Sequence, residues 1–321
     1  MDPGNKLGMM VFKHFIICLI TAIGLTANCV GFIASFYMKI RFPTARLLLR
    51  LQFIIDAFGC IVAVAYWVIL NLNKELTSGP LFTYIWTNFY VAAVFGILSS
   101  NNMMLLAVDR HWAVVGFRTY NRDSKCYPAG LLVSSVALMI FGTTPIVLVT
   151  YYQEHVDHIG LKKLFLLTKL NAALVLFIGL IVPTIVISVL QLRILLILRR
   201  IKSAATATNF SSTGGPGQSV VQTVDKSTIG ITTGILVMLI TFAVARTYHI
   251  LQFSLSMFGD LQPEGGTNPQ ADIVYSYSIT FCINPLALIF TSPAARAWLF
   301  TLVVLPVKTT LSQVFQRLQQ N

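Results

Sequence analysis

The chain contains seven long stretches of apolar residues, and these stretches limit its fold more than any other feature. Each is at least 23 residues long, and only Asp56, Arg246 and the titratable His249 interrupt them. About 20 residues of apolar helix cross a bilayer core about 30 Å thick, and a helix pairs its own backbone polar groups. The stretches are 15–38, 51–73, 76–108, 126–153, 170–192, 227–259 and 273–295. The sequence therefore predicts an all-α fold, a seven-transmembrane helix bundle.

An eighth apolar run covers residues 297–307 and is only 11 residues long. This run is too short to span a bilayer, so we expect a short amphipathic or interfacial helix after the seventh span. The whole chain, residues 1–321, is expected to form a single domain. Its parts are an outer tail at 1–10, the seven-helix bundle at 11–292, the interfacial helix at 293–307 and a cytoplasmic tail at 308–321.

The net charge of +12 is distributed according to the predicted spans. Of the 23 Lys and Arg residues, sixteen lie in one alternate set of connections, six lie in the other set, and Arg246 lies within a span. The positive-inside rule places the richer set in the cytoplasm. We therefore expect a multi-pass protein of the cell membrane, in contact with lipid, with an extracellular N-terminus and a cytoplasmic C-terminus. The positive-inside rule thus explains the net positive charge, and no nucleic-acid partner is expected.

Sequence motifs of enzymes are missing. The chain contains no Gly-x-x-x-x-Gly-Lys, no His-Glu-x-x-His and no Gly-x-Ser-x-Gly. The loop sequence Glu-His-Val-Asp-His at 154–158 resembles a metal-ligand set, but a solvated polar loop explains it better. The sequence predicts neither a catalytic site nor a metal site.

Three polar residues fall inside predicted spans and are expected to meet. Asp56 lies in the second span, Asn28 in the first and Asn284 in the seventh, where Pro285 follows it. A charge at membrane depth costs at least about 2.5 kcal/mol, so it is expected to face the bundle interior and to find partners there. A lone asparagine usually bonds two helices together. The three residues together predict an internal polar cluster.

The sixth predicted span carries a second polar group near its outer end. Arg246 and His249 are three residues apart and therefore project from neighbouring positions on one helix face. One reading is that they pair with Asp272, Tyr275 or backbone carbonyls at the rim. The other is that a buried cation in an outward cavity binds an anionic ligand such as a carboxylate. The candidate ligand-binding residues are Arg246, His249, Tyr248, Phe89, Gln252 and Tyr275.

Several of these residues, with others, occur in an order and spacing that resemble those of a rhodopsin-like (class A) G-protein-coupled receptor. The resemblance covers all seven spans. The matching positions are Asn28, Asp56, Ser99, Asp109-Arg110-His111, Pro183 and Asn284-Pro285. Each motif alone is weak, but together they stand in the correct order and each on the correct span. The charge distribution independently places Asp109-Arg110 on the cytoplasmic side.

The resemblance implies roles for these residues. Asn28, Asp56, Ser99 and Asn284 would line an internal polar site that in the family can hold sodium and that rearranges on activation. Asp109 would hold Arg110 at rest, and Arg110 would then meet a heterotrimeric G protein. His111, Asn284, Pro285 and Pro183 would belong to the same coupling and activation machinery. The implied function is to transduce the signal of an extracellular small-molecule or lipid-like ligand, through helix rearrangement, to the G protein.

The chain also departs from the family pattern. The sixth span lacks the family's tryptophan and proline, Leu288 replaces the tyrosine of Asn-Pro-x-x-Tyr, and Gln191 stands where a tyrosine is usual. The family's disulfide between the top of the third span and the second outer loop cannot form, because all five cysteines lie in spans or on the cytoplasmic side. The seventh span has no lysine for retinal, and no aspartate marks an amine site in the third. Two alternatives stay open: an ion- or proton-coupled transporter or channel, and a receptor-like protein that has lost signalling.

Overall fold

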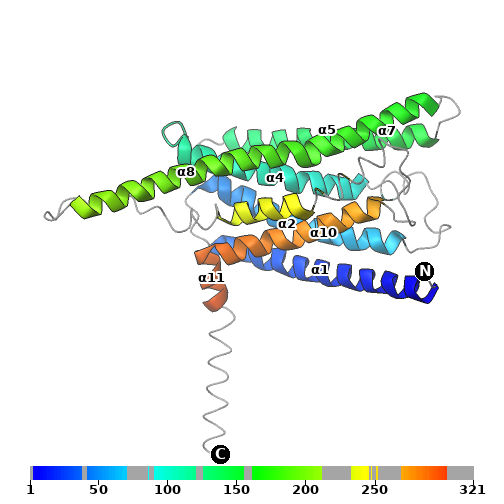
Figure 1. Cartoon of the computed structure of the whole chain (residues 1–321), viewed down its shortest axis with the longest axis horizontal. Coiled ribbons are helices and arrows are strands. Elements are labelled where there is room, and N and C mark those ends of the chain that lie inside the picture. Colours follow the sequence, from blue (N-terminus) through cyan, green and yellow to red (C-terminus); the bar gives the residue numbers. More distant parts are fainter. Residues whose placement is uncertain are drawn as a thin grey trace, which may run out of the picture.

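The computed structural model describes residues 3–37, 42–70, 86, 90–120, 126–154, 161–211, 233–245, 247, 251 and 269–301. These residues form helices that run nearly side by side (Figure 1). The helices are α1 (Pro3–Tyr37), α2 (Pro43–Leu70), α4 (Tyr90–Val115), α5 (Cys126–Glu154), α7 (Leu161–Leu176), α8 (Val182–Ser211), α10 (Pro269–Thr291) and α11 (Pro293–Leu299). A further short helix covers Thr233–Ala245. In the described part, six helices are long and apolar enough to span a membrane, and the seventh predicted span is represented by Thr233–Ala245.

The bundle is apolar outside and polar inside. Large apolar side chains such as Phe15 and Phe290 are 64% and 62% exposed. The residues below 2% exposure include Asn28, Gln52 and Asp56. In water this distribution would be unfavourable, whereas a lipid solvent accepts the apolar surface and drives the polar groups into the interior.

Glycines allow the helices to approach closely. A Cβ atom at Gly59 of α2 would lie 2.5 Å from the ring of Phe281, which is buried in α10. A Cβ atom at Gly96 of α4 would likewise overlap the ring of Tyr277. Both rings belong to the buried apolar cluster beside the polar core. Small residues at such contacts bring α2, α4 and α10 together around the interior.

The helix bounds differ from the predicted spans where charged residues occur. The helix that was predicted to begin at Leu51 begins at Pro43 instead. It therefore includes Arg50, whose side chain is partly covered. Its guanidinium lies 3.9 Å from the Phe36 ring centroid and its Nε donates to Ser35 Oγ. A long arginine side chain can thus leave the apolar zone while its stem stays buried.

The helix after Pro183 also continues beyond its predicted end at residue 192, to Ser211. Residues Phe177–Ile181, just before this proline, form a π-helical turn between α7 and α8. Proline lacks a backbone N–H, and such irregular turns accommodate the change in hydrogen bonding.

The short helix expected after the seventh span is α11, which begins at Pro293. Ser292 caps it by accepting a hydrogen bond from the backbone N–H of Ala295 at 3.4 Å. The Trp298 ring stacks on Tyr37 at the end of α1, with centroids 5.4 Å apart. α11 therefore lies at the end of the bundle opposite the first residues of α1 and runs at a steep angle to α10 (Figure 1).

Candidate functional site

Asp56 is the centre of a buried hydrogen-bond network that joins three helices. Ser99 Oγ of α4 donates to Asp56 Oδ1 at 2.7 Å, and Asn284 Nδ2 of α10 donates to Asp56 Oδ2 at 3.0 Å. Gln52 Nε2, one turn earlier on α2, lies 2.9 Å from each carboxylate oxygen. The structure thus brings together Asp56, Ser99 and Asn284, which the sequence had placed in one site, and adds Gln52.

A second amide extends the network to α4. Asn102 Nδ2 donates to Gln52 Oε1 at 2.8 Å and to the backbone carbonyl of Leu48 at 2.8 Å. Gln52 Nε2 also donates to Ser99 Oγ at 2.8 Å. Sequence analysis missed both Gln52 and Asn102. The spacing of four residues between Gln52 and Asp56, which places them on one helix face, was the available signal.

Asn28 ties α1 to the same region of α10. Its Nδ2 donates to the Gly24 carbonyl at 2.9 Å and to the Phe281 carbonyl at 3.0 Å. Phe281 precedes Asn284 by three residues, and Pro285 lies inside the same helix. A proline in a helix leaves a carbonyl one turn earlier without its usual N–H donor. Phe281 lies four residues before Pro285, so the Asn28 amide donates to the carbonyl that the proline leaves without its usual partner.

A second polar group lies near the end of α4, at the end of the bundle that carries α11. Arg110 Nη2 and Nε donate to Asp109 Oδ2 at 2.7 Å and 3.2 Å. The Tyr120 hydroxyl donates to the other oxygen, Asp109 Oδ1, at 2.9 Å. The guanidinium carbon of Arg110 lies 4.9 Å from the Phe42 ring centroid, within cation–π range. Arg110 is only 2% exposed, so this arrangement holds it away from solvent.

Tyr120 is held by its surroundings in the protonated form that donates. Burial, followed by the charge of Asp109, raises the pKa of Tyr120 to about 12. Its ring packs edge-on against Phe42 and Trp112. The hydroxyl therefore stays protonated at physiological pH and can donate to Asp109. The sequence did not single out Tyr120, because it lies eleven residues beyond Asp109 in a connecting segment.

The other predicted activation residues, His111 and Pro183, lie on α4 and α8. His111 follows Arg110 on α4, and its buried Nε2 has no hydrogen-bond partner among the described residues. Pro183 is buried in α8. Neither contacts the Asp109–Arg110 pair through a described hydrogen bond, so their roles stay predictions.

Most of the predicted ligand-binding residues lie outside the described part of the chain. These are Phe89, Arg246, Tyr248, His249 and Gln252. Tyr275 is described and is half-buried in α10. The anion site at Arg246 and His249 therefore stays a prediction.

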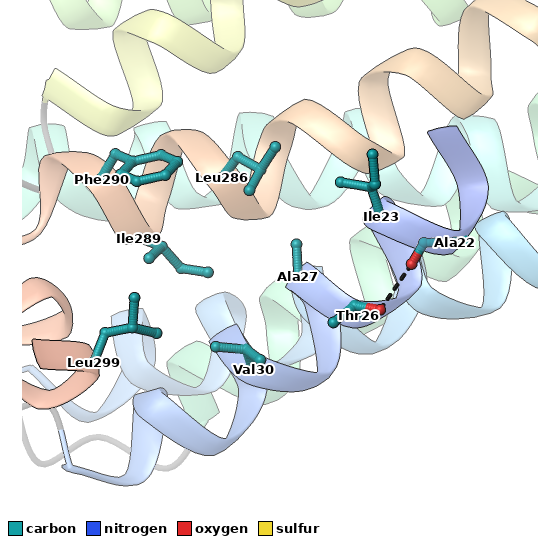
Figure 2. Close-up of a pocket in the computed structure, with 9 residues that line it drawn as sticks. All are labelled: Ala22, Ile23, Thr26, Ala27, Val30, Leu286, Ile289, Phe290 and Leu299. Atoms are coloured by element: carbon teal, nitrogen blue, oxygen red, sulfur yellow. Dashed lines mark hydrogen bonds between the residues drawn. The ribbon is translucent and has the colours of Figure 1, made fainter. Parts of the chain in front are cut away.

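A lateral groove of about 420 Å³ lies between α1, α10 and α11 (Figure 2). Its lining is almost entirely apolar, and the Thr26 hydroxyl donates to the Ala22 carbonyl at 2.8 Å. The residues that line it are Ala22, Ile23, Thr26, Ala27, Val30, Leu286, Ile289, Phe290 and Leu299. None of the predicted ligand residues is among them, and the groove fits the lipid-facing surface.

Comparison with known proteins agrees with this geometry. The family model for the 7 transmembrane receptor (rhodopsin family) matches residues 28–287, from Asn28 to beyond Pro285. The chain belongs to the rhodopsin family of seven-transmembrane receptors. This receptor is similar in fold to squid rhodopsin, with a TM-score of 0.61, 14% sequence identity, and coverage of 89% of this chain and 83% of that one. Among curated proteins, none matches the chain.

Membership settles the broad class of this receptor. It is a multi-pass membrane protein and a signalling receptor, not an enzyme. Ligand and G-protein partners follow in general from the family. All five cysteines are described and free, so none of them forms the outer disulfide usual in the family.

Two departures from the family pattern are visible in the packing of this receptor. Leu288, in place of the usual tyrosine, is 2% exposed and joins the apolar core around Phe242 and Met103. Gln191, also in place of a tyrosine, is buried in α8, and neither of its amide atoms has a hydrogen-bond partner among the described residues. Leu288 therefore makes apolar contacts at a position where the family places a hydroxyl group.

Proposed function

We propose that this receptor transduces an extracellular ligand signal to a heterotrimeric G protein, and that release of Arg110 from Asp109, to which Tyr120 also donates, is the inner step. The supporting observation is the buried contact in which two N–H groups of Arg110 donate to Oδ2 of Asp109, while Tyr120 donates to Oδ1 of the same carboxylate. A buried ion pair is costly unless its hydrogen bonds are satisfied. Such a pair near the end of a spanning helix is suited to switch between a paired and a released state.

The orientation proposed for this receptor places the Asp109–Arg110 end in the cytoplasm and the N-terminus outside. The richer set of basic connections supports it, and its described members include Arg46 in the first turn of α2, Arg118 just after α4 and Arg296 within α11. Epitope tags placed after Gly116 and before Pro3 test the orientation in intact cells. Antibody access to the tag after Gly116 from the medium would reverse it.

Nucleotide exchange on a G protein tests the proposed inner step. Arg110→Ala should abolish ligand-independent and ligand-dependent exchange while leaving surface expression near that of the unmodified receptor. Transmembrane current recorded from the same cells is the discriminating measurement. A current lost in Arg110→Ala, with no exchange in the unmodified receptor, would instead favour a transporter or channel.

The ligand proposed for this receptor is a small organic or lipid-like acid. The support is the sequence position of Arg246 and His249, one turn apart on the predicted sixth span, where a buried cation needs an anionic partner. A carboxylate would accept paired hydrogen bonds from the guanidinium. Phe89, Tyr248, Gln252 and Tyr275 would form the remaining contacts.

A panel of carboxylic acids and their methyl esters, read out by G-protein dissociation, tests this ligand class. Arg246→Ala should weaken the response to an active acid and barely change the response to its ester. Lys169→Gln is a matched control, because it removes another cation from the outer part of the chain. Equal losses for acid and ester in Arg246→Ala would exclude the anion site.

A further inference from the structure

The family resemblance implies a sodium ion beside Asp56, and the donors around this carboxylate test whether one fits. A hard cation binds through oxygen lone pairs, and a carboxylate offers about four of them. Donors already face both of these oxygens: Ser99 reaches Oδ1, Asn284 reaches Oδ2, and Gln52 Nε2 lies 2.9 Å from each, so that one of its N–H groups is shared between them while the other faces Ser99. The residues present therefore do not fit a sodium ion on Asp56.

The direction of these hydrogen bonds is fixed from outside the cluster. The backbone carbonyl of Leu48 can only accept, so the Asn102 side chain must turn its Nδ2 toward it. The second hydrogen of Nδ2 then points to Gln52, which must present Oε1 there. Gln52 is thereby left with its Nε2 facing Asp56 and Ser99. Reversing the Gln52 amide would place oxygen against oxygen at the carboxylate.

The Gln52 amide occupies the position at which a cation would balance the charge of Asp56. Its Nε2 presents the positive end of an N–H group between the two oxygens of a carboxylate that is fully buried. The same nitrogen reaches Ser99 Oγ, so an oxygen that a cation would need is turned toward the amide. Among the described residues, no group of three or more acidic, histidine or cysteine side chains offers a metal site.

We propose that Gln52 replaces the sodium ion as the positive partner of Asp56, and that this receptor is consequently insensitive to sodium. Gln52 is then a positioning residue that fastens α2 to α4 through Ser99 and Asn102. A tethered amide cannot dissociate, so the link between these helices does not vary with the ionic composition outside the cell. This inference concerns the bundle itself and holds whether or not the receptor activates a G protein.

Thermal unfolding of the purified full-length receptor in lipid nanodiscs tests the proposal. A thiol-reactive dye can report unfolding, because Cys60 and Cys282 are buried in the folded bundle. The midpoint temperature is compared in sodium chloride and choline chloride at an ionic strength of about 150 mM, which matches screening in the two salts. The unmodified receptor should unfold at the same temperature in both.

Gln52→Leu supplies the positive arm of the test. It frees lone pairs on both carboxylate oxygens and on Ser99, so sodium should now bind and raise the midpoint by about 2 to 4 °C over choline. Asp56→Asn added to Gln52→Leu should remove this rise. Gln191→Leu is the matched control, since it makes the same change at a buried glutamine on α8, and it should show no sodium response.

Two results would overturn the proposal. The first is a sodium-specific rise in the unmodified receptor that Asp56→Asn abolishes, because it would place the ion on Asp56 with Gln52 present. The second is a folded Gln52→Leu receptor with the same midpoint in both salts. If Gln52→Leu does not fold, Gln52→Met repeats the test with an unbranched side chain, and the comparison on the unmodified receptor still decides.

Discussion

Replacing Tyr120 by phenylalanine tests the inner step of the proposed mechanism with a single atom. The substitution removes the hydroxyl that donates to Asp109 Oδ1 at 2.9 Å and keeps the ring that packs against Phe42 and Trp112. Asp109 would keep its contact with Arg110 through Oδ2. The change therefore weakens the Arg110–Asp109–Tyr120 group but keeps the contact between Arg110 and Asp109.

The expected size of the effect follows from the strength of the hydrogen bond between Tyr120 and Asp109. A hydrogen bond to a charged group contributes about 1.5 to 3 kcal/mol, and the half-buried position of Tyr120 favours the lower end. A loss of about 1.4 kcal/mol that affects only the resting state moves the equilibrium about tenfold toward the released state. A released population of about 1% would become about 10%, and basal nucleotide exchange should rise by a similar factor.

Basal exchange on a G protein in membranes, at matched surface expression, measures the effect. Because burial and Asp109 raise the pKa of Tyr120 to about 12, the hydroxyl stays protonated, so its contribution should be constant from about pH 6 to pH 9. Tyr37→Phe is the matched control, since its ring also lies at this end of the bundle and stacks on Trp298. Unchanged basal exchange in Tyr120→Phe, beside a clear rise in Asp109→Asn, would refute the role assigned to the hydroxyl.

Further outcomes are expected from substitutions elsewhere in the bundle. Asp56→Asn should change basal exchange and leave surface expression largely intact; a collapse of expression would show that the carboxylate is needed for folding. Gly59→Val should destabilise the receptor by about 1 to 3 kcal/mol, because the new side chain overlaps Phe281, whereas Gly130→Val, with nothing within 4 Å of its Cβ position, should have little effect on the unfolding midpoint. Reducing agents should leave the unfolding midpoint unchanged, because all five cysteines are free; a shift would reveal a disulfide.

The spans were predictable because each depends on local composition. An apolar stretch long enough to cross a bilayer becomes a helix whatever its neighbours are, since its backbone has no water to bond to. The helix ends were less predictable. Arg50 suggested a boundary after it, whereas its side chain bonds Ser35 and lies over Phe36 inside the helix bounds. The sequence does not show which neighbouring helix will cover an arginine.

The candidate site was predictable only in part. Asp56, Ser99 and Asn284 could be grouped because a buried charge needs partners and because their order resembles a known family. Gln52 and Asn102 carry no charge and match no motif. The spacing of four residues between Gln52 and Asp56 was a signal, but it does not distinguish Gln52 from an amide that merely joins helices.

The sequence by itself determined that this chain crosses a membrane seven times and that Asp56 could not be left without partners. Only the tertiary structure decided which atoms those partners are. Helix rotation and relative depth result from packing among all the helices, and a few ångströms determine whether an amide donates to a carboxylate. The Leu48 carbonyl, which orients Asn102 and through it Gln52, acts only once α2 and α4 are in contact.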